Sequence, residues 1–182
     1  MVNVRKATMD DCAAIARVQV DSYRTAYAGI FPQEYLDGFT YAEQEQDWRE
    51  LLSSRRDDIL LVAETDSSEV VGYALGRPGP TGVAPYDCEL VALHVRRAVQ
   101  RQGIGGRLMA ATVRALCQRD CESLMLWVLA ENPARRFYER LGGQLLSRTQ
   151  IALGAVEVAY GWRDMESLVA GCEVSAAIPI PN

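Results

Sequence analysis

The residues best suited to chemistry lie in two short segments in the second half of the chain. The first segment is a glycine-rich turn after the apolar stretch 88–95, and it contains Gln100, Arg101, Gln102, Gly103, Ile104, Gly105, Gly106 and Arg107. A helix that begins at such a turn presents free backbone N–H groups and the positive end of its dipole to an anion. Glycines let the main chain approach a ligand closely. The turn therefore predicts a pyrophosphate cradle, supported by Arg101 and Arg107.

Two common phosphate motifs do not fit this turn. A dinucleotide fingerprint needs a third glycine where the chain has Leu108, and a P-loop needs a Gly-Lys-Ser/Thr ending. A tight connection without any ligand remains an alternative at this point. If the turn does bind a ligand, the sequence predicts a different phosphate-bearing molecule.

The second segment, residues 132–141, supplies further polar groups, among them Asn132, Arg135 and Tyr138. Upstream, Glu89 and His94 lie on the expected strand before the turn. Because side chains alternate along a strand, these two are expected on opposite faces of the sheet. His94 is the single histidine, so a zinc site built on several histidines is excluded, and we expect no metal. No G-x-S-x-G motif indicates a nucleophilic serine.

Composition narrows the class of protein. The chain has 182 residues with 19 basic and 24 acidic side chains, and the net charge of −5 argues against a nucleic-acid or membrane partner recognised by a basic surface. No apolar run is long enough to span a membrane, and the N-terminus lacks the apolar core of a signal peptide. Five cysteines without a CxxC pair suggest reduced thiols and a cytoplasmic location.

The elements that position these residues follow from periodicity and breakers. The expected strands cover residues 2–7, 59–63, 70–76, 88–95, 123–130, 144–150 and 156–162. Helices are expected from about residue 10 to about 25, over 32–53 with an interruption near 38–40, after the glycine-rich turn, and over 132–141. This order predicts an α/β (α+β) fold, with helices on both faces of a mixed sheet. A single domain is expected over residues 1–165, with a flexible tail over 166–182.

The two segments together resemble the GNAT superfamily of acetyl-CoA-dependent N-acetyltransferases. Gln100-x-x-Gly103-x-Gly105 is similar to its signature turn, and the run from Leu126 to Gly142 resembles its second motif nearly position for position. The resemblance covers residues 2–163. It implies a mostly antiparallel central sheet of about six to seven strands. Three departures are Gly143 in place of a common Phe, His94 in place of a Tyr or apolar residue, and Arg96-Arg97 in place of His-Pro.

The resemblance also implies a site for acetyl-CoA. The residues implied to contact the cofactor are the main chain of Leu93, His94 and Val95, the turn from Gln100 to Arg107, and Asn132, Arg135 and Tyr138. It implies direct attack of an amine on the thioester, without an acyl-enzyme. Tyr138 would be the general acid, although a buried aromatic role also explains it. Glu89 would be the base, and a solvated carboxylate that only binds a cationic substrate is the alternative.

The acceptor side is implied to involve aromatic residues. Tyr23, Tyr27 and Phe31, with Glu89, are the expected substrate-binding residues, and Tyr35 and Trp48 belong to the same segment. Aromatic rings can hold an amine by cation–π contact, but packing between helices explains them equally well. We expect a small-molecule amine as acceptor and a possible homodimer. The alternatives are a protein N-terminal or lysine acetyltransferase and an inactive CoA-binding sensor.

Overall fold

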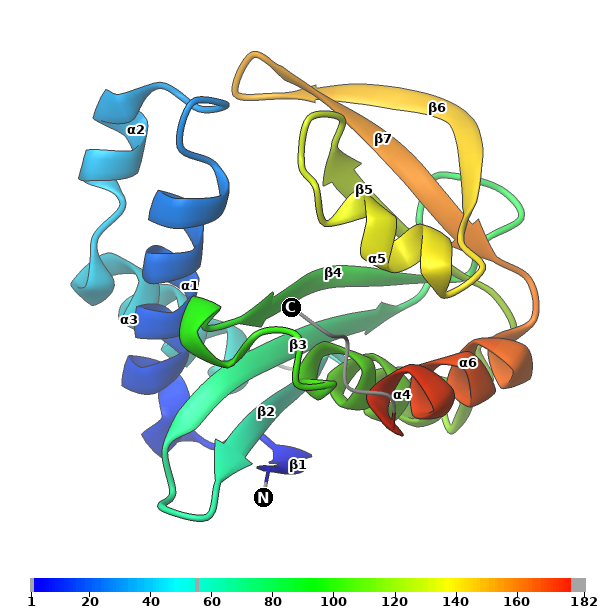
Figure 1. The fold of residues 1–182 in the computed structure, drawn as a ribbon, viewed down its shortest axis with the longest axis horizontal. Coiled ribbons are helices and arrows are strands. Elements are labelled where there is room, and N and C mark those ends of the chain that lie inside the picture. The colour runs from blue at the N-terminus through cyan, green and yellow to red at the C-terminus, as the bar shows by residue number, and fades with distance from the viewer. Residues whose placement is uncertain (1, 55, 178–182) are drawn as a thin grey trace.

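One seven-stranded sheet runs through the protein (Figure 1). The computed structural model describes residues 2–54 and 56–177. The strand order is β1-β2-β3-β4-β5-β7-β6, and only the β4–β5 pair is parallel. The strands are β1 (Val2–Lys6), β2 (Ile59–Thr65), β3 (Val70–Pro78), β4 (Cys88–Val95), β5 (Leu124–Leu129), β6 (Gln144–Ala152) and β7 (Ala155–Trp162). The prediction of a mixed, mostly antiparallel sheet is confirmed.

Helices cover both faces of this sheet, as predicted (Figure 1). They are α1 (Cys12–Ala26), α2 (Gln33–Gly38), α3 (Tyr41–Ser53), α4 (Ile104–Cys117), α5 (Arg135–Arg140) and α6 (Met165–Ala177). The expected helix over 32–53 is interrupted at Phe39 and Thr40, where the predicted break lies. Thr40 is the N-cap of α3, because its hydroxyl accepts a hydrogen bond from the backbone N–H of Glu43.

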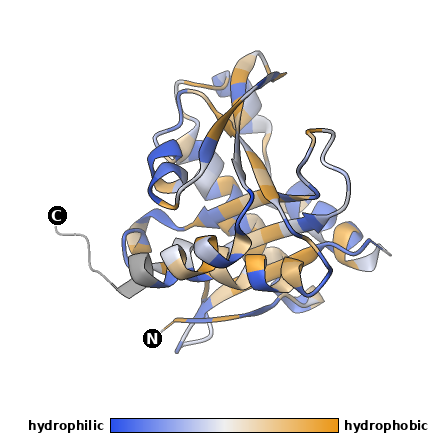
Figure 2. Cartoon of the chain, turned by 90° about the vertical axis from the view of Figure 1, so that its right-hand side faces the viewer, coloured by the Kyte–Doolittle hydropathy of each residue, from blue (hydrophilic) through white to orange (hydrophobic). Residues whose placement is uncertain are grey.

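Two apolar cores lie on opposite faces of the sheet. Helices α4, α5 and α6 bury one face, around Leu108, Val113 and Tyr160. Helices α1 and α3 bury the other face, around Ile15 and Trp48. Figure 2 shows apolar residues along the central strands, between helices with more hydrophilic outer surfaces. Burial on both faces explains why β2 and β3 are nearly continuous apolar runs.

The segment after residue 165 differs from its expectation. Residues Met165–Ala177 form α6, which packs against α4, whereas the sequence predicted a flexible tail from residue 166. Met165, Leu168 and Cys172 recur at helical spacing and are buried in the α4 core. The small residues between them obscured this apolar stripe, so the expectation is wrong for 166–177. Residues 178–182 of the expected tail lie outside the described residues. No helix in the described part of the chain has the length and apolar content needed to cross a membrane.

Candidate active site

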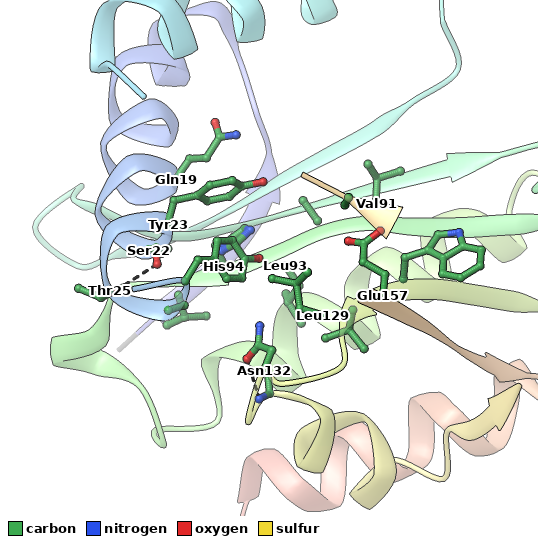
Figure 3. A pocket seen from close by; sticks show the side chains of 18 of the residues that line it. Gln19, Ser22, Tyr23, Thr25, Val91, Leu93, His94, Leu129, Asn132 and Glu157 are labelled. Carbon is green, nitrogen blue, oxygen red and sulfur yellow. Dashed lines mark hydrogen bonds between the residues drawn. The ribbon is translucent and has the colours of Figure 1, made fainter. Parts of the chain in front are cut away.

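The middle of the sheet opens into a cavity of about 680 Å³. Strands β4 and β5 pair only at Cys88–Leu124 and Glu89–Met125. Past these pairs the strands separate, and the cavity is lined by residues 90–95 of β4 and 127–129 of β5 (Figure 3). The separation leaves the backbone of both strand edges without its usual sheet partner. An extended ligand can therefore add between them as an extra strand.

A β-bulge at Val91 decides which side chains of β4 reach this cavity. Leu75 and Gly76 are consecutive on β3, yet they pair with Ala92 and Leu90, so Val91 is an extra residue. Before the bulge, Cys88 and Leu90 face α4, and after it Leu93 and Val95 do. Glu89 and His94 therefore lie on the same face, towards α1. The expectation that they face opposite surfaces is wrong, because the bulge shifts the alternation by one residue.

The glycine-rich turn has the geometry of an anion cradle. Gly103 has φ of 76° and Arg101 has φ of 62°, so two left-handed residues bend the chain into the start of α4. No acceptor is seen among the described residues for the backbone N–H groups of Ile104, Gly105 and Gly106. Gln100 fixes the turn to the strand, because its side-chain amide donates to the carbonyl of Val95 at 2.9 Å. Free N–H groups at the start of a 14-residue helix fit a phosphate group.

The arginines of the two motifs do not all face this site. Arg107 donates to the carbonyl of Val2 and lies outside the cavity lining. Arg135 donates to Ala130 and Tyr160, so its guanidinium fixes the loop before α5 instead. Contact of these two side chains with the cofactor stays a prediction. Arg97, one of the departures from the family pattern, lines the cavity beside Gln100.

Tyr138 reaches the cavity from the α5 side. Its ring packs against Phe137 and Trp162, with centroid separations of 5.3 and 6.3 Å. Burial raises the pKa of the phenol above its ordinary value, so the hydroxyl keeps its proton at neutral pH. A side chain at Gly143 would collide with the indole of Trp162 at 2.6 Å, so Trp162 fills the space beside Tyr138. Tyr138 is both a core aromatic and a cavity residue.

Asn132 is buried where β5 gives way to α5. Its side-chain oxygen accepts the N–H of Ala134 at 2.9 Å, and this bond shapes the turn before the helix. Figure 3 shows its amide nitrogen on the cavity side. The side chain therefore has one atom committed to the fold and one donor available to a ligand.

Glu89 lies at the last paired position before β4 and β5 separate. Its own side chain is not part of the cavity lining, although its neighbour Leu90 is. Burial raises the pKa of Glu89; Arg77 opposes that shift and Glu157 adds to it. Arg77 itself is held by Asp58 at 2.9 Å. Within the described chain, no hydrogen bond or ion pair to the Glu89 carboxylate is seen.

The expected acceptor residues lie together on the α1 and α2 side of the cavity. Tyr23, Tyr27 and Phe31 all line it, and their rings make consecutive edge contacts at 4.7 and 5.1 Å. Burial raises the pKa of Tyr23 to about 12. His94 stacks between Tyr23 and Tyr73, and burial lowers its pKa to about 4, so the imidazole is neutral. Neutral rings therefore dominate this wall.

Sequence reasoning also missed Glu157 and Tyr73, which both line the cavity. Glu157 lies on β7 opposite Leu129 and points into the cavity (Figure 3). Tyr73 on β3 is fully buried, and its hydroxyl has no hydrogen-bond partner among the described residues. Neither strand carries a local sequence signal that singles these two residues out. Only the pairing of β5 with β7 and of β3 with β4 brings them to the site.

A separate cluster lies at the opposite end of β4. Ligand atoms of Asp87, Cys88 and Cys121 lie within 4.8 Å of one another. The Asp87 carboxylate already accepts the backbone N–H groups of Glu122 and Ser123 at 2.9 Å. The Cys88 thiol donates to the carbonyl of Ser123. These bonds hold the start of β5 against β4.

Comparison with known families gives the arrangement a context. Residues 20–143 match the acetyltransferase (GNAT) family, a span that includes the separated strands and the glycine-rich turn. The chain belongs to the GNAT acetyltransferase family. This GNAT protein is 34% identical over 171 residues to the uncharacterised N-acetyltransferase YuaI of Bacillus subtilis, covering 92% of this chain and 96% of that one. The resemblance seen in the sequence is confirmed, and the protein is an acetyltransferase by family.

Solved structures share the fold of this GNAT protein. PaiA N-acetyltransferase of Thermoplasma acidophilum, in complex with coenzyme A, matches with a TM-score of 0.71 at 19% identity, over 89% of this chain and 99% of that one. YncA of Salmonella typhimurium, with acetyl-CoA, matches with a TM-score of 0.62 at 19% identity, over 90% and 94%. At these identities the likeness shows the fold.

Proposed function

We propose that this GNAT protein transfers an acetyl group from acetyl-CoA to a primary amine on a small molecule, by direct attack. The observation that carries the proposal is the cavity between β4 and β5, which reaches from the aromatic wall of α1 to Gln100 beside the glycine-rich turn. A donor with a phosphate-bearing end and a thin arm fits one half of this space. An amine fits the other half.

Acetyl-CoA, the acetyl donor, supplies an activated thioester. The free N–H groups at the start of α4 would hold its phosphates, with Arg97 as the nearby positive side chain. The unpaired edge of β4 at residues 93–95 would hold its arm by main-chain hydrogen bonds. A backbone N–H on that edge would also polarise the carbonyl that the amine attacks.

Tyr138 would protonate the leaving sulfur. Its phenol carries a proton at neutral pH because burial raises its pKa. A thiolate held beside it is a strong enough base to take that proton. Among the described lining residues there is no cysteine, and neither Ser22 nor Thr25 hydrogen bonds to a histidine or a carboxylate, which favours direct attack over an acyl-enzyme.

Glu89 would accept the proton that the amine loses. The Glu89 side chain is not part of the cavity lining, so the proton would pass from the amine to its carboxylate through a water molecule. Burial raises its pKa, which makes the carboxylate a better base than one in water. His94 is less suited, because burial lowers its pKa to about 4 and makes the imidazole a weak base.

The first test is binding and turnover with acetyl-CoA. Calorimetry with acetyl-CoA and its desphospho analogue is expected to show binding that depends on the phosphates. Thiol release in the presence of a panel of amines then measures transfer. Absence of binding at millimolar acetyl-CoA would overturn the proposal. Binding without transfer to any amine would favour a CoA-binding sensor instead.

The Tyr138→Phe variant tests the general acid. We expect kcat to fall by about 100-fold or more while the affinity for acetyl-CoA stays within twofold, since a general acid contributes on the order of 10²–10⁴ in rate. Tyr41→Phe is the matched control, because Tyr41 is exposed and hydrogen bonds only to Asp21. Full activity in Tyr138→Phe would show that another group protonates the thiol.

A further inference from the structure

Glu157 places an unpaired negative charge in the acceptor half of the cavity. It lies on β7 and faces the same side as Ala155 and Ala159, towards α2, while Val158 and Tyr160 face α4 and α5. Its Oε2 accepts a hydrogen bond from Gln150 at 2.7 Å. No ion pair to Glu157 occurs in the part of the chain that the structure describes. Glu157 is half-buried and lines the cavity, so a cationic group of a ligand can reach its carboxylate there.

The surroundings of Glu157 show where its charge acts. Its negative charge contributes to raising the pKa values of Tyr23, Tyr27 and Glu89. These groups come from α1 and β4, so the carboxylate faces the middle of the acceptor half. Glu89 lies across β5 from Glu157, on the same face of the sheet but outside the cavity lining.

The opposite charge in the cavity lies elsewhere. Among the described residues that line it, Arg97 is the one arginine, and it sits beside Gln100 at the cofactor end. His94 is neutral at physiological pH because burial lowers its pKa. A carboxylate on the acceptor would therefore meet Glu157 and, within the described lining, no cation at the aromatic end. A positive charge there would meet Glu157 and the faces of tyrosine rings.

An acceptor with two amino groups uses them differently in the reaction. The amine that attacks the thioester must lose its proton, so it gains nothing from a permanent ion pair. A second ammonium group on the same molecule stays charged throughout the reaction. Glu157 lies on the far side of the β5 strand from Glu89, which suits recognition of that second group.

We propose that Glu157 is a specificity-determining residue that selects acceptors with a second positive charge, that is, diamines with an apolar spacer. This inference rests on the proposed function. The aromatic rings of Tyr23, Tyr27 and Phe31 pack against the spacer, and Glu157 pairs with the ammonium that does not react. Amino acids and amines with an uncharged far end are poor acceptors, because they have no second positive charge at that end to pair with Glu157.

The test compares three probes of similar length: 1,5-diaminopentane, pentylamine and 6-aminohexanoate. Calorimetry measures their affinity for the protein saturated with coenzyme A, so the readout does not depend on turnover. The wild type is expected to prefer the diamine by about 10- to 100-fold over the other two, since a hydrogen bond to a charged group is worth this much. Where acetyl transfer occurs, the same preference is expected in KM.

Glu157→Gln is expected to remove this preference and leave the affinity for pentylamine within twofold. Glu50→Gln is the matched control, because it removes the same charge from an exposed position on α3. A wild type that binds all three probes equally, or a Glu157→Gln protein that keeps the preference, would overturn the inference. In either case transfer of acetyl to pentylamine still supports the proposed function, whereas failure to bind coenzyme A removes that function itself.

Discussion

At the scale of single residues, the site is built from groups whose surroundings change their acidity. Burial raises the pKa of Tyr138 and of Glu89, and it lowers the pKa of His94. These directions match a proton donor, a proton acceptor and a neutral ring. The same desolvation is compatible with all three proposed roles, because it always disfavours the charged form.

A pH profile tests the role of Glu89. A base works in its deprotonated form, and burial raises the Glu89 pKa above its usual 4.5, so kcat/KM is expected to fall as pH drops through that raised value. Glu157 adds to the upward shift, so Glu157→Gln should move this acidic limb to lower pH. Glu89→Gln should reduce kcat and abolish the limb. If Glu89→Gln leaves the acidic limb of the pH profile unchanged, that limb reports the titration of another group.

At the scale of elements, the strand-to-helix junction forms the proposed cofactor site. Strand β4 ends at Val95, Gln100 fastens the following turn to it, and α4 begins after the left-handed Gly103. The direction of the free N–H groups depends on that conformation. A residue with a side chain is strained at a φ near 76°. A substitution at Gly103 would therefore disturb the conformation that points the N–H groups at a phosphate.

Gly103→Ala tests this dependence against Gly82→Ala. Both glycines have nearly equal positive φ, 76° and 74°, and Gly82 lies in the loop between β3 and β4 with open space around it. Each variant is expected to lose about 1–2 kcal/mol of stability. Only Gly103→Ala is expected to bind coenzyme A at least about tenfold more weakly, because hydrogen bonds to charged phosphates contribute about 1.5–3 kcal/mol each. Calorimetry and chemical denaturation measure the two effects. Equal affinity in a folded Gly103→Ala protein would contradict the cradle.

At the scale of the whole molecule, two cores hold the two halves of the cavity. The α4–α5–α6 core supports Tyr138 and the cofactor side, and helices α1 and α3 support His94 and the acceptor side. The β4–β5 opening lies between them, so the cavity needs both cores to stay in place. Helix α6 belongs to the first core, although it contributes no residue to the cavity lining.

Leu168→Ala tests the contribution of α6. Leu168 is 2% exposed against α4, and a leucine-to-alanine change in such a position costs about 2–5 kcal/mol of unfolding free energy. Glu166→Ala, at an exposed position on the same helix, is expected to change stability by about 0.5 kcal/mol or less. Denaturation curves measure the free energy of unfolding of both variants. A Leu168→Ala protein as stable as the wild type would show that α6 contributes little to the core.

The amino-acid sequence alone determined the order of the strands and helices up to β7, the glycine-rich turn and the second motif with Asn132 and Tyr138. These features are local, because periodicity, caps and glycines act within a few residues of the chain. Only the tertiary structure decided which face Glu89 shares with His94, since a single extra residue at Val91 shifts the alternation without a sequence signal. It also decided that Arg107 and Arg135 turn away, that α6 packs on α4, and that Glu157 and Tyr73 join the cavity. Those outcomes depend on contacts between segments distant in sequence, which local patterns do not encode.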